Sequence, residues 1–297
     1  MYELVKVTER FYFVDCPAKI GIYKMSDREI ALIDSGNNKG AANKVLRIAE
    51  ENGWQIRMIL VTHAHCDHIG GCLHIKSRTG CKVYAPRGEL GAVLHPPRGN
   101  AILYGAKPPK ELSHGFLFAP ACEAEALTEA VLPEGLSVLP LPGHTEDQYG
   151  FATDDGAVYL ADALASRATL EKYGIPYVYD VGIYLETLER IAAMQGAHFV
   201  SAHSEMTEDI APLARENIRK TEELISVILE EVSEPIAFEG LLERIFSRYG
   251  LVMSLEQYLL VGSTLRSYLT YLSEVDKITH TVKDRMLCWV KREEREE

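Results

Sequence analysis

The 297-residue sequence lacks the features that define several classes of protein. Its six cysteines form no Cys-x-x-Cys pair and are too sparse in a chain of this length to indicate a disulfide framework. No apolar run approaches the roughly 20 residues that a membrane helix needs. The first residues also lack the basic and apolar stretches of a secretion signal. We therefore expect reduced cysteines, no membrane association and a cytoplasmic location.

The sequence is also short of basic residues. It has 31 Lys and Arg against 43 Asp and Glu, which gives a formal net charge of -12. Because non-specific binding to nucleic acid depends on basic side chains that displace counterions, this balance argues against a nucleic-acid partner. The hydrophobic share of 47% and the charged share of 25% are typical of a globular protein with a buried core.

Strand and helix patterns alternate along the first 210 residues. Short β-branched or aromatic runs predict strands, and apolar residues at helical spacing predict helices. The expected strands are residues 11–15, 29–36, 56–62, 81–86, 136–145, 148–155, 157–164 and 198–205, and the expected helices are residues 39–53, 69–80 and 183–194. This alternation predicts an α/β layer architecture.

The pattern weakens between about residues 86 and 133. This stretch is rich in Pro and Gly, includes several aromatic residues and shows no sustained period. Long irregular segments inside compact domains are usually functional lids or disordered. The aromatic residues favour a packed, lid-like insert.

The chain changes character after residue 210. Helical patterns cover residues 213–232, 238–250 and 254–275, and residues 277–291 resemble a hairpin. We therefore predict a catalytic domain over 1–210 and a small, helical, winged-helix-like domain over 211–297. Residues 215–297 hold 12 Lys and Arg against 16 Asp and Glu, a net charge of -4, whereas nucleic-acid modules usually show the opposite bias. Apolar helix faces of this kind more often form a core or a dimer surface than a binding site. A homodimer is therefore an open alternative.

The run "MILVTHAHCDHIGGC" concentrates four potential metal ligands in one short segment. His63 and His65 share one side of an extended strand exit because side chains alternate there, and Asp67 and His68 fall at the start of the following helix. The segment can therefore offer four groups to two adjacent ions. Imidazole nitrogen and carboxylate oxygen suit zinc, or iron or manganese. The alternative is a polar strand-to-helix turn without a metal.

Three further candidates lie at the ends of later strands. These are His144 in "LPLPGHT", Asp162 in "AVYLADA" and His203 in "HFVSAHS". In layered α/β proteins, binding groups gather where strands end and loops begin. A single histidine or aspartate at a strand end is weak evidence of a binding site. Three such residues that follow the histidine segment in the sequence predict one shared site.

The motifs "THAHCDH" at 62–68, "PGHT" at 142–145, "LADA" at 160–163 and "SAHS" at 201–204 carry a resemblance to the metallo-β-lactamase superfamily. The resemblance covers roughly residues 1–210 and implies an αββα sandwich. It implies a first metal held by His63, His65 and His144, and a second held by Asp67, His68 and His203. Asp162 would bridge the two ions, which we expect to be zinc, with iron or manganese as alternatives.

Departures from particular branches of the family narrow the expected function. Antibiotic-degrading members generally lack the bridging aspartate, and diiron flavoproteins carry a glutamate where this chain has His65. The remaining pattern resembles glyoxalase II, lactonase and nuclease branches. We expect a dinuclear hydrolase whose bridging hydroxide attacks a small ester-type substrate, favouring a thioester or a lactone, with Asp67 as the catalytic proton acceptor. A nuclease or phosphodiesterase and a metal-dependent sensor are the alternatives.

Substrate contacts are expected from the insert and from the loop after Asp162. The alternative is that the tyrosines in that loop only pack against neighbouring side chains. The polar or amphipathic candidates are Arg98, Tyr104, Lys107, His114, Tyr173, Tyr177 and Tyr179.

Overall fold

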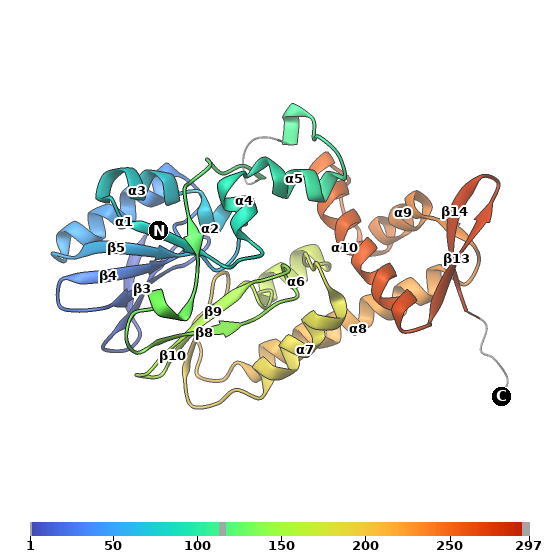
Figure 1. Cartoon of the computed structure of the whole chain (residues 1–297). Helices are drawn as coiled ribbons and strands as arrows, with labels where there is room; N and C mark the ends of the chain where they lie inside the picture. The colour runs from blue at the N-terminus through green and yellow to red at the C-terminus, as the bar shows by residue number, and fades with distance from the viewer. Residues whose placement is uncertain (1, 113–116, 293–297) are drawn as a thin grey trace.

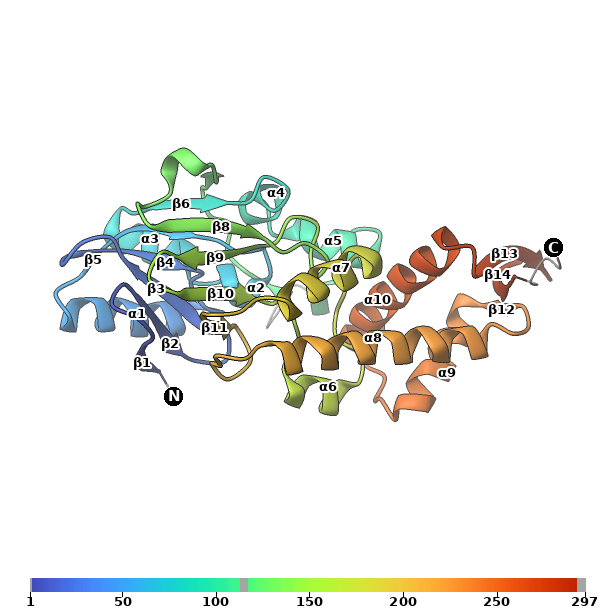
Figure 2. The same ribbon diagram turned by 90° about the horizontal axis from the view of Figure 1, so that it is seen from below.

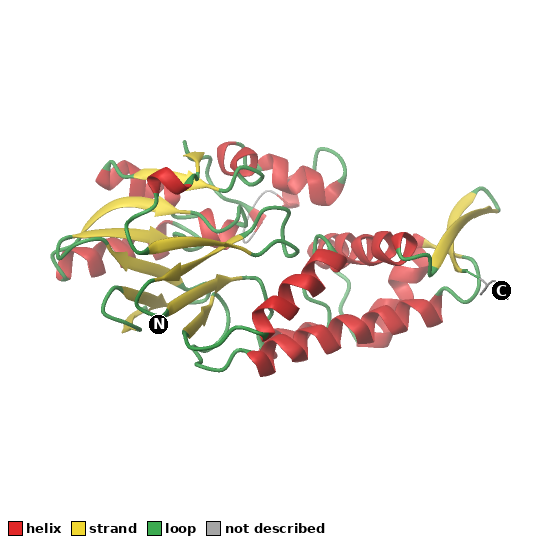
Figure 3. Cartoon of the chain, turned by 60° about the horizontal axis from the view of Figure 1, so that its bottom comes forward, coloured by secondary structure: helices red, strands yellow, loops and turns green. Residues whose placement is uncertain are grey.

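The computed structural model describes residues 2–112 and 117–292, and its larger part is a four-layered sandwich (Figure 1). Two β-sheets pack face to face, and helices cover their outer faces (Figure 3). The α/β prediction and the αββα arrangement implied by the resemblance are both confirmed. No helix in the described part of the chain is long and apolar enough to cross a membrane.

The first sheet has seven strands in sequence order. Strands β1 to β4 form an antiparallel meander, whereas β4 to β7 run parallel. Their bounds are β1 Glu3–Lys6, β2 Phe11–Asp15, β3 Ile20–Lys24, β4 Glu29–Ile33, β5 Gln55–Leu60, β6 Lys82–Ala85 and β7 Glu125–Ala126.

The second sheet has four strands in the order β11-β10-β9-β8. β8, β9 and β10 are antiparallel neighbours, and β11 joins β10 in parallel after a crossover through α6 and α7. The bounds are β8 Leu136–Pro140, β9 Tyr149–Thr153, β10 Ala157–Ala161, α6 Arg167–Tyr173, α7 Val181–Ala192 and β11 His198–Ser201.

The period-two alternation of β4 shows how the layers are held together. Ile30 and Leu32 belong to the apolar cluster beneath the outer helices α1 (Lys39–Glu51) and α3 (Cys72–Thr79). Ala31 and Ile33 face the other way, into the cluster between the sheets, with Phe151 and Tyr159 of the second sheet. Both faces of the strand are therefore buried, as expected for a central strand of a layered fold.

The insert contains more regular structure than the sequence suggested. It holds α4 (Leu90–Leu94), α5 (Pro97–Tyr104), short 3-10 turns at Lys110–Leu112 and Glu129–Val131, and β7. The prediction of a stretch without regular structure is therefore wrong for α4 and α5. Proline disfavours the interior of a helix, but Pro97 occupies the first turn of α5, where a missing N–H costs nothing.

The C-terminal region contains three helices and a small sheet, in the expected order (Figure 2). The elements are α8 (Ala211–Glu231), β12 (Ile236–Ala237), α9 (Phe238–Tyr249), α10 (Leu255–Glu274), β13 (Ile278–Lys283) and β14 (Met286–Lys291). β12 pairs with β14, so the hairpin forms a three-stranded sheet. One apolar cluster joins Leu160 and Leu188 to Leu224 and Leu265, so the core continues across residue 210. The domain boundary and the winged-helix label stay predictions.

The histidine segment packs against the loop after β4 with almost no space between the two backbones. A Cβ atom at Gly70 would meet the carbonyl of Asn37, and one at Gly71 would meet the carbonyl of Ser35. Both glycines have ordinary right-handed backbone angles. Close approach, rather than backbone conformation, therefore requires glycine here.

Gly71→Ala should lower the free energy of unfolding by about 1–3 kcal/mol, because the added methyl group forces the two segments apart. Gly99→Ala is the matched control, since it lies inside α5 with open space around it. That change should be neutral or stabilising by up to about 1 kcal/mol. Thermal and urea unfolding of the two variants measure the difference. Equal stability of the two variants would contradict the close-packing argument.

Candidate metal centre

The chain brings all seven predicted ligand residues to one edge of the sandwich. His63 and His65 follow β5, and Asp67 and His68 lie in the four-residue helix α2 (Cys66–Ile69). The remaining three, His144, Asp162 and His203, lie in the β8–β9 loop, after β10 and after β11. Both sheets therefore contribute to the cluster, and the sandwich must close before the cluster exists.

The seven side chains form two groups, and within each group the potential ligand atoms lie within 4.8 Å of one another. One group is His63, His65 and His144, and the other is Asp67, His68, Asp162 and His203. In the first, His65 Nδ1 lies 3.0 Å from both His63 Nε2 and His144 Nε2. In the second, Asp67 Oδ2 lies 3.3 Å from His203 Nε2 and 3.6 Å from His68 Nε2.

The Asp162 carboxylate lies between the two groups. Its Oδ2 atom is 3.7 Å from His144 Nε2 in the first group and 3.3 Å from His203 Nε2 in the second. Its Oδ1 atom is 3.4 Å from His68 Nε2. A single carboxylate thus faces both groups.

Hydrogen bonds to the outer ring nitrogens orient four of the histidines. His68 Nδ1 donates to Asp34 Oδ2 (2.7 Å), His144 Nδ1 to the carbonyl of Tyr177 (3.1 Å) and His203 Nδ1 to the carbonyl of Pro17 (2.6 Å). His63 Nδ1 lies 3.0 Å from Thr62 Oγ1. In each case a neighbouring oxygen holds the outer ring nitrogen, so Nε2 is the nitrogen directed into the cluster. This is the usual arrangement of metal-binding histidines.

Sequence reasoning missed Asp34, which stands at the centre of this network. Asp34 is almost fully buried and accepts hydrogen bonds from Thr62 N (2.8 Å), Thr62 Oγ1 (2.8 Å) and His68. Its φ of 64° is in the left-handed region, which aspartate tolerates better than most residues. The signal in the sequence is an aspartate directly after the apolar run "EIALI", near the end of the strand expected over residues 29–36.

Glu89 of the insert was also missed. Its carboxylate accepts from Ala64 N (3.0 Å) inside the histidine segment and from Asp147 N (3.4 Å) in the loop that carries His144. Glu89 is buried, so the start of the insert joins two ligand-bearing loops. Nothing in the local sequence distinguishes this glutamate from a solvated one.

The charge balance of the cluster favours cations. Burial and neighbouring histidines lower the pKa of His63, and burial together with His65 lowers that of His144 to about 4, so both rings are neutral at pH 7. Burial alone would raise the pKa of Asp67, but His68 and His203 outweigh it and bring it to about 2. The charge of Asp162 raises the pKa of His203 to about 10. Burial lowers the pKa of His68, but Asp162 and Asp67 outweigh it and raise this pKa above its usual value. Without a metal these two rings are therefore cationic at pH 7, and a metal ion bound at Nε2 would displace their protons.

Two buried atoms in the cluster have unused hydrogen-bonding capacity. Among the described residues, His68 Nε2 and Asp162 Oδ1 are buried and face each other at 3.4 Å without hydrogen-bond geometry. A buried polar atom without a well-formed hydrogen bond is costly. A metal ion at each group would satisfy these atoms and the converging nitrogens of the three-histidine group, so the donor set fits a pair of metal ions.

A small cavity of about 90 Å³ opens beside this cluster. It is lined by His144, Asp162 and His203 on one side and by residues that include Tyr177 on the other. The Tyr177 ring lies edge-on to His65 and His144, at centroid distances of 5.4 and 5.5 Å. Tyr177, one of the predicted substrate contacts, therefore lies beside the cluster.

The other substrate candidates are elsewhere. Arg98 and Tyr104 lie on α5 and are exposed, and neither lines the small cavity. His114 lies outside the described residues. The expectation that Tyr173 belongs to a loop is wrong, since it is the last residue of α6. Contact of Arg98, Tyr104 or His114 with substrate stays a prediction.

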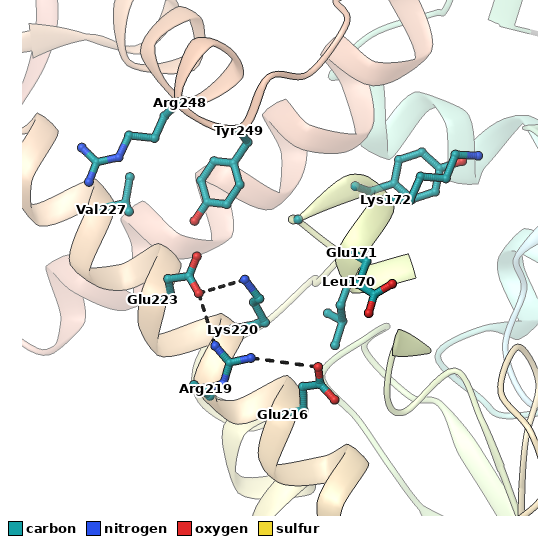
Figure 4. Close-up of a pocket in the computed structure, with 12 residues that line it drawn as sticks. Leu170, Glu171, Lys172, Glu216, Arg219, Lys220, Glu223, Val227, Arg248 and Tyr249 are labelled. Atoms are coloured by element: carbon teal, nitrogen blue, oxygen red, sulfur yellow. Dashed lines mark hydrogen bonds and ion pairs between the residues drawn. The ribbon is translucent and has the colours of Figure 1, made fainter. Parts of the chain in front are cut away.

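A larger cavity, of about 660 Å³, lies between α6, α8 and α9 and contains no predicted ligand (Figure 4). Charged side chains line it, and most of these are paired with one another. Glu223 lies 2.9 Å from Lys220 and 3.6 Å from Arg219. The cavity is therefore separate from the metal cluster.

An αββα sandwich with a histidine and aspartate cluster at the strand ends defines a class of metal-binding proteins. The profile of the Metallo-beta-lactamase superfamily matches residues 15–203. The chain belongs to this superfamily.

Curated relatives are similar over part of the chain. A hydroxyacylglutathione hydrolase from Bradyrhizobium sp. (strain ORS 278) is 33% identical over 126 residues, which is 42% of this chain and 40% of that protein. One from Methylobacterium sp. (strain 4-46) is 51% identical over 45 residues, 15% of this chain and 18% of that protein. The similarity therefore spans less than half the length of these relatives.

Solved structures support the fold over nearly the whole chain. A metallo-beta-lactamase family protein from Thermus thermophilus superposes with a TM-score of 0.70 at 18% identity and covers 98% of each chain. A subclass B3 metallo-beta-lactamase from a soil metagenome library has a TM-score of 0.58 at 19% identity, covering 77% of this chain and 97% of that one. At these identities the likeness concerns the fold alone.

Asp34→Asn should weaken metal binding by roughly 10- to 100-fold, because the amide cannot accept every hydrogen bond that orients His68. Metal content by mass spectrometry and chelator competition measure the loss. Asp154→Asn is the control, since this carboxylate lies in an exposed pair with Arg10, away from the cluster. Unchanged metal affinity in Asp34→Asn would show that the Asp34 contact does not orient the ligand.

The loop between α6 and α7 is attached to α10. Val178 N donates to the buried hydroxyl of Thr264 (3.3 Å). The same loop provides the carbonyl of Tyr177 that accepts from His144. The C-terminal helix therefore helps to position a metal-site histidine.

Thr264→Val preserves shape but removes the acceptor for Val178 N, which should cost about 1–3 kcal/mol of stability. We expect a lower melting temperature and several-fold weaker binding of the first metal equivalent. Thr270→Val, an exposed position on the same helix, is the control. Calorimetric titration measures metal binding by the two variants. Equal metal affinity of both would show that Thr264 does not help to position His144.

Proposed function

We propose that this protein is a metal-dependent hydrolase of small acyl esters, with thioesters favoured and lactones next. The observation that carries the proposal is the Asp162 carboxylate, which lies within 4.0 Å of ligand nitrogens from both groups. A shared carboxylate is what a two-metal site needs to fix the separation of its ions. Proteins of this superfamily that hydrolyse acyl thioesters are among the relatives.

We propose that His63, His65 and His144 hold one ion, that Asp67, His68 and His203 hold the other, and that Asp162 contacts both. Zinc is the favoured metal, with iron or manganese as alternatives. When bound, the ions would lower the pKa of water toward neutrality and polarise the carbonyl oxygen of the ester.

Two side chains are placed to assist the reaction. The Asp67 side chain is about a third exposed and ionised at neutral pH, so it can accept a hydrogen bond from water and pass on its proton. Burial raises the pKa of Tyr177 to about 12, so its phenol stays protonated. Its O–H can therefore donate a hydrogen bond, and we propose that Tyr177 orients the substrate in the cavity.

The relatives favour a thioester over the alternatives. Their name, hydroxyacylglutathione hydrolase, describes hydrolysis of an acyl thioester of glutathione. The similar segment is only 40% of that protein, so the thioester is our proposal for this chain. A phosphodiesterase and a metal-dependent sensor are the other outcomes, and the cytoplasmic location and the homodimer stay predictions.

Asp162→Ala should remove both metal equivalents or reduce them sharply, and thioester hydrolysis should fall by at least 100-fold. Metal analysis and an assay with a hydroxyacylglutathione, a lactone and a phosphodiester measure this. Asp27→Ala, an exposed turn position, is the control. Full activity of Asp162→Ala would contradict the proposal that Asp162 contacts both metal ions. Activity on the phosphodiester alone would indicate a phosphodiesterase, and full metal loading without activity on any substrate would indicate a sensor.

A further inference from the structure

A second cavity, of about 300 Å³, lies next to the small one beside the metal cluster. It is bounded by the loop after α6 on one side and by the first half of α10 on the other. Thr169, Pro176 and Tyr177 line both cavities, so these three residues form a common wall. A chain that leaves the small cavity past these residues would enter the second cavity, beside α10.

The lining of this second cavity is mainly apolar. Ile175, Pro176, Leu260 and Val261 provide aliphatic surface, and only Thr169, Gln257 and two tyrosines add polar atoms. No Asp, Glu, Lys or Arg is among the described residues that line it. Such a cavity stabilises an uncharged, apolar group and penalises a charged one.

The sizes of the two cavities assign different parts of a substrate to them. The small cavity has room for about three water-sized groups, enough for an ester and its immediate neighbours. The second cavity falls at the lower end of the range for ligand pockets. The reacting ester and a chain attached to it would therefore be held in separate compartments.

We propose that the cavity between the α6–α7 loop and α10 binds an aliphatic chain of the substrate, so that the enzyme selects esters or thioesters carrying an unbranched chain. This inference rests on the proposed hydrolase function. The chain can belong to the acyl group or to the thiol that leaves. Leu260 and Val261 of α10 determine the preferred chain length.

Two substrate series test the proposal with the metal-loaded protein. The first varies the acyl chain from acetyl through butanoyl and hexanoyl to octanoyl on one small thiol, and the second varies the alkyl thiol on one acetyl group. In one series kcat/KM should rise about 4-fold per added methylene until the cavity is filled. Dependence in the first series assigns the cavity to the acyl chain, and dependence in the second assigns it to the leaving group.

Variants of Leu260 separate a binding role from a folding defect. Leu260→Trp should lower the ratio of kcat/KM for the longest over the shortest substrate at least 10-fold by filling the cavity. Leu260→Ala should move the optimum to longer chains, a gain that misfolding cannot produce. Leu255→Trp, a 41% exposed position on the same helix and outside the cavity, should leave the profile unchanged.

Calorimetric binding of carboxylates gives a readout that does not depend on turnover. Octanoate should bind more tightly than butanoate, and Leu260→Trp should remove the difference. Flat profiles in both series together with equal binding of the two carboxylates would overturn this inference while hydrolysis itself persisted. Absence of hydrolysis of every ester in a fully metal-loaded protein would instead contradict the proposed function.

Discussion

The hydrogen bonds to the buried Asp34 carboxylate join the ends of two central strands to the histidine segment. A carboxylate removed from water is stable only when its oxygens are paired, and here three donors satisfy them. The donors come from Thr62 after β5 and from His68 in α2, so the strand ends and the ligand are fixed together. The close approach of the Gly70 and Gly71 backbone to Asn37 and Ser35 also holds the histidine segment against the loop after β4. The position of the cluster therefore depends on local packing that is set before any metal binds.

The cluster also depends on the pairing of the two sheets. His63, His65, Asp67 and His68 follow strands of the first sheet, whereas His144, Asp162 and His203 lie on loops of the second. The apolar contacts between the sheets, such as those of Ile33 with Tyr159, bring these loops together. Once they meet, burial and mutual repulsion keep His63, His65 and His144 neutral, while the ionised carboxylates of Asp67 and Asp162 hold protons on His68 and His203. Folding thus creates a buried site in which a metal ion can take the place of those protons.

The sequence predicted what is encoded by local periodicity and by residue type at strand ends. The strands β2, β4 to β6 and β8 to β11, the helices α1, α3 and α7 and the order of the C-terminal elements follow from such patterns, and all seven cluster residues were named. The strands β1, β3 and β7 were not predicted. Asp34 and Glu89 were missed because their roles depend on partners that folding brings near, and an isolated carboxylate has no local signal. The helices of the insert and α6 were missed because they are short. α5, for example, is held by tertiary contacts, since its Leu103 packs against an apolar cluster that includes Leu259 of α10.

Helix α10 influences the site through the loop between α6 and α7. The seven cluster residues lie in loops and in the short helix α2 at one edge of the sandwich. α10 contributes none of them, but its Thr264 hydroxyl holds the loop that orients His144, and Leu260 and Val261 line the apolar cavity. If the proposed reaction holds, substitutions at Leu260 and Val261 would change which chain is accepted without altering the cluster. Chemistry and chain selectivity would then depend on different elements, and the loop between α6 and α7 would couple them, because Tyr177 lies beside both the cluster and the apolar cavity.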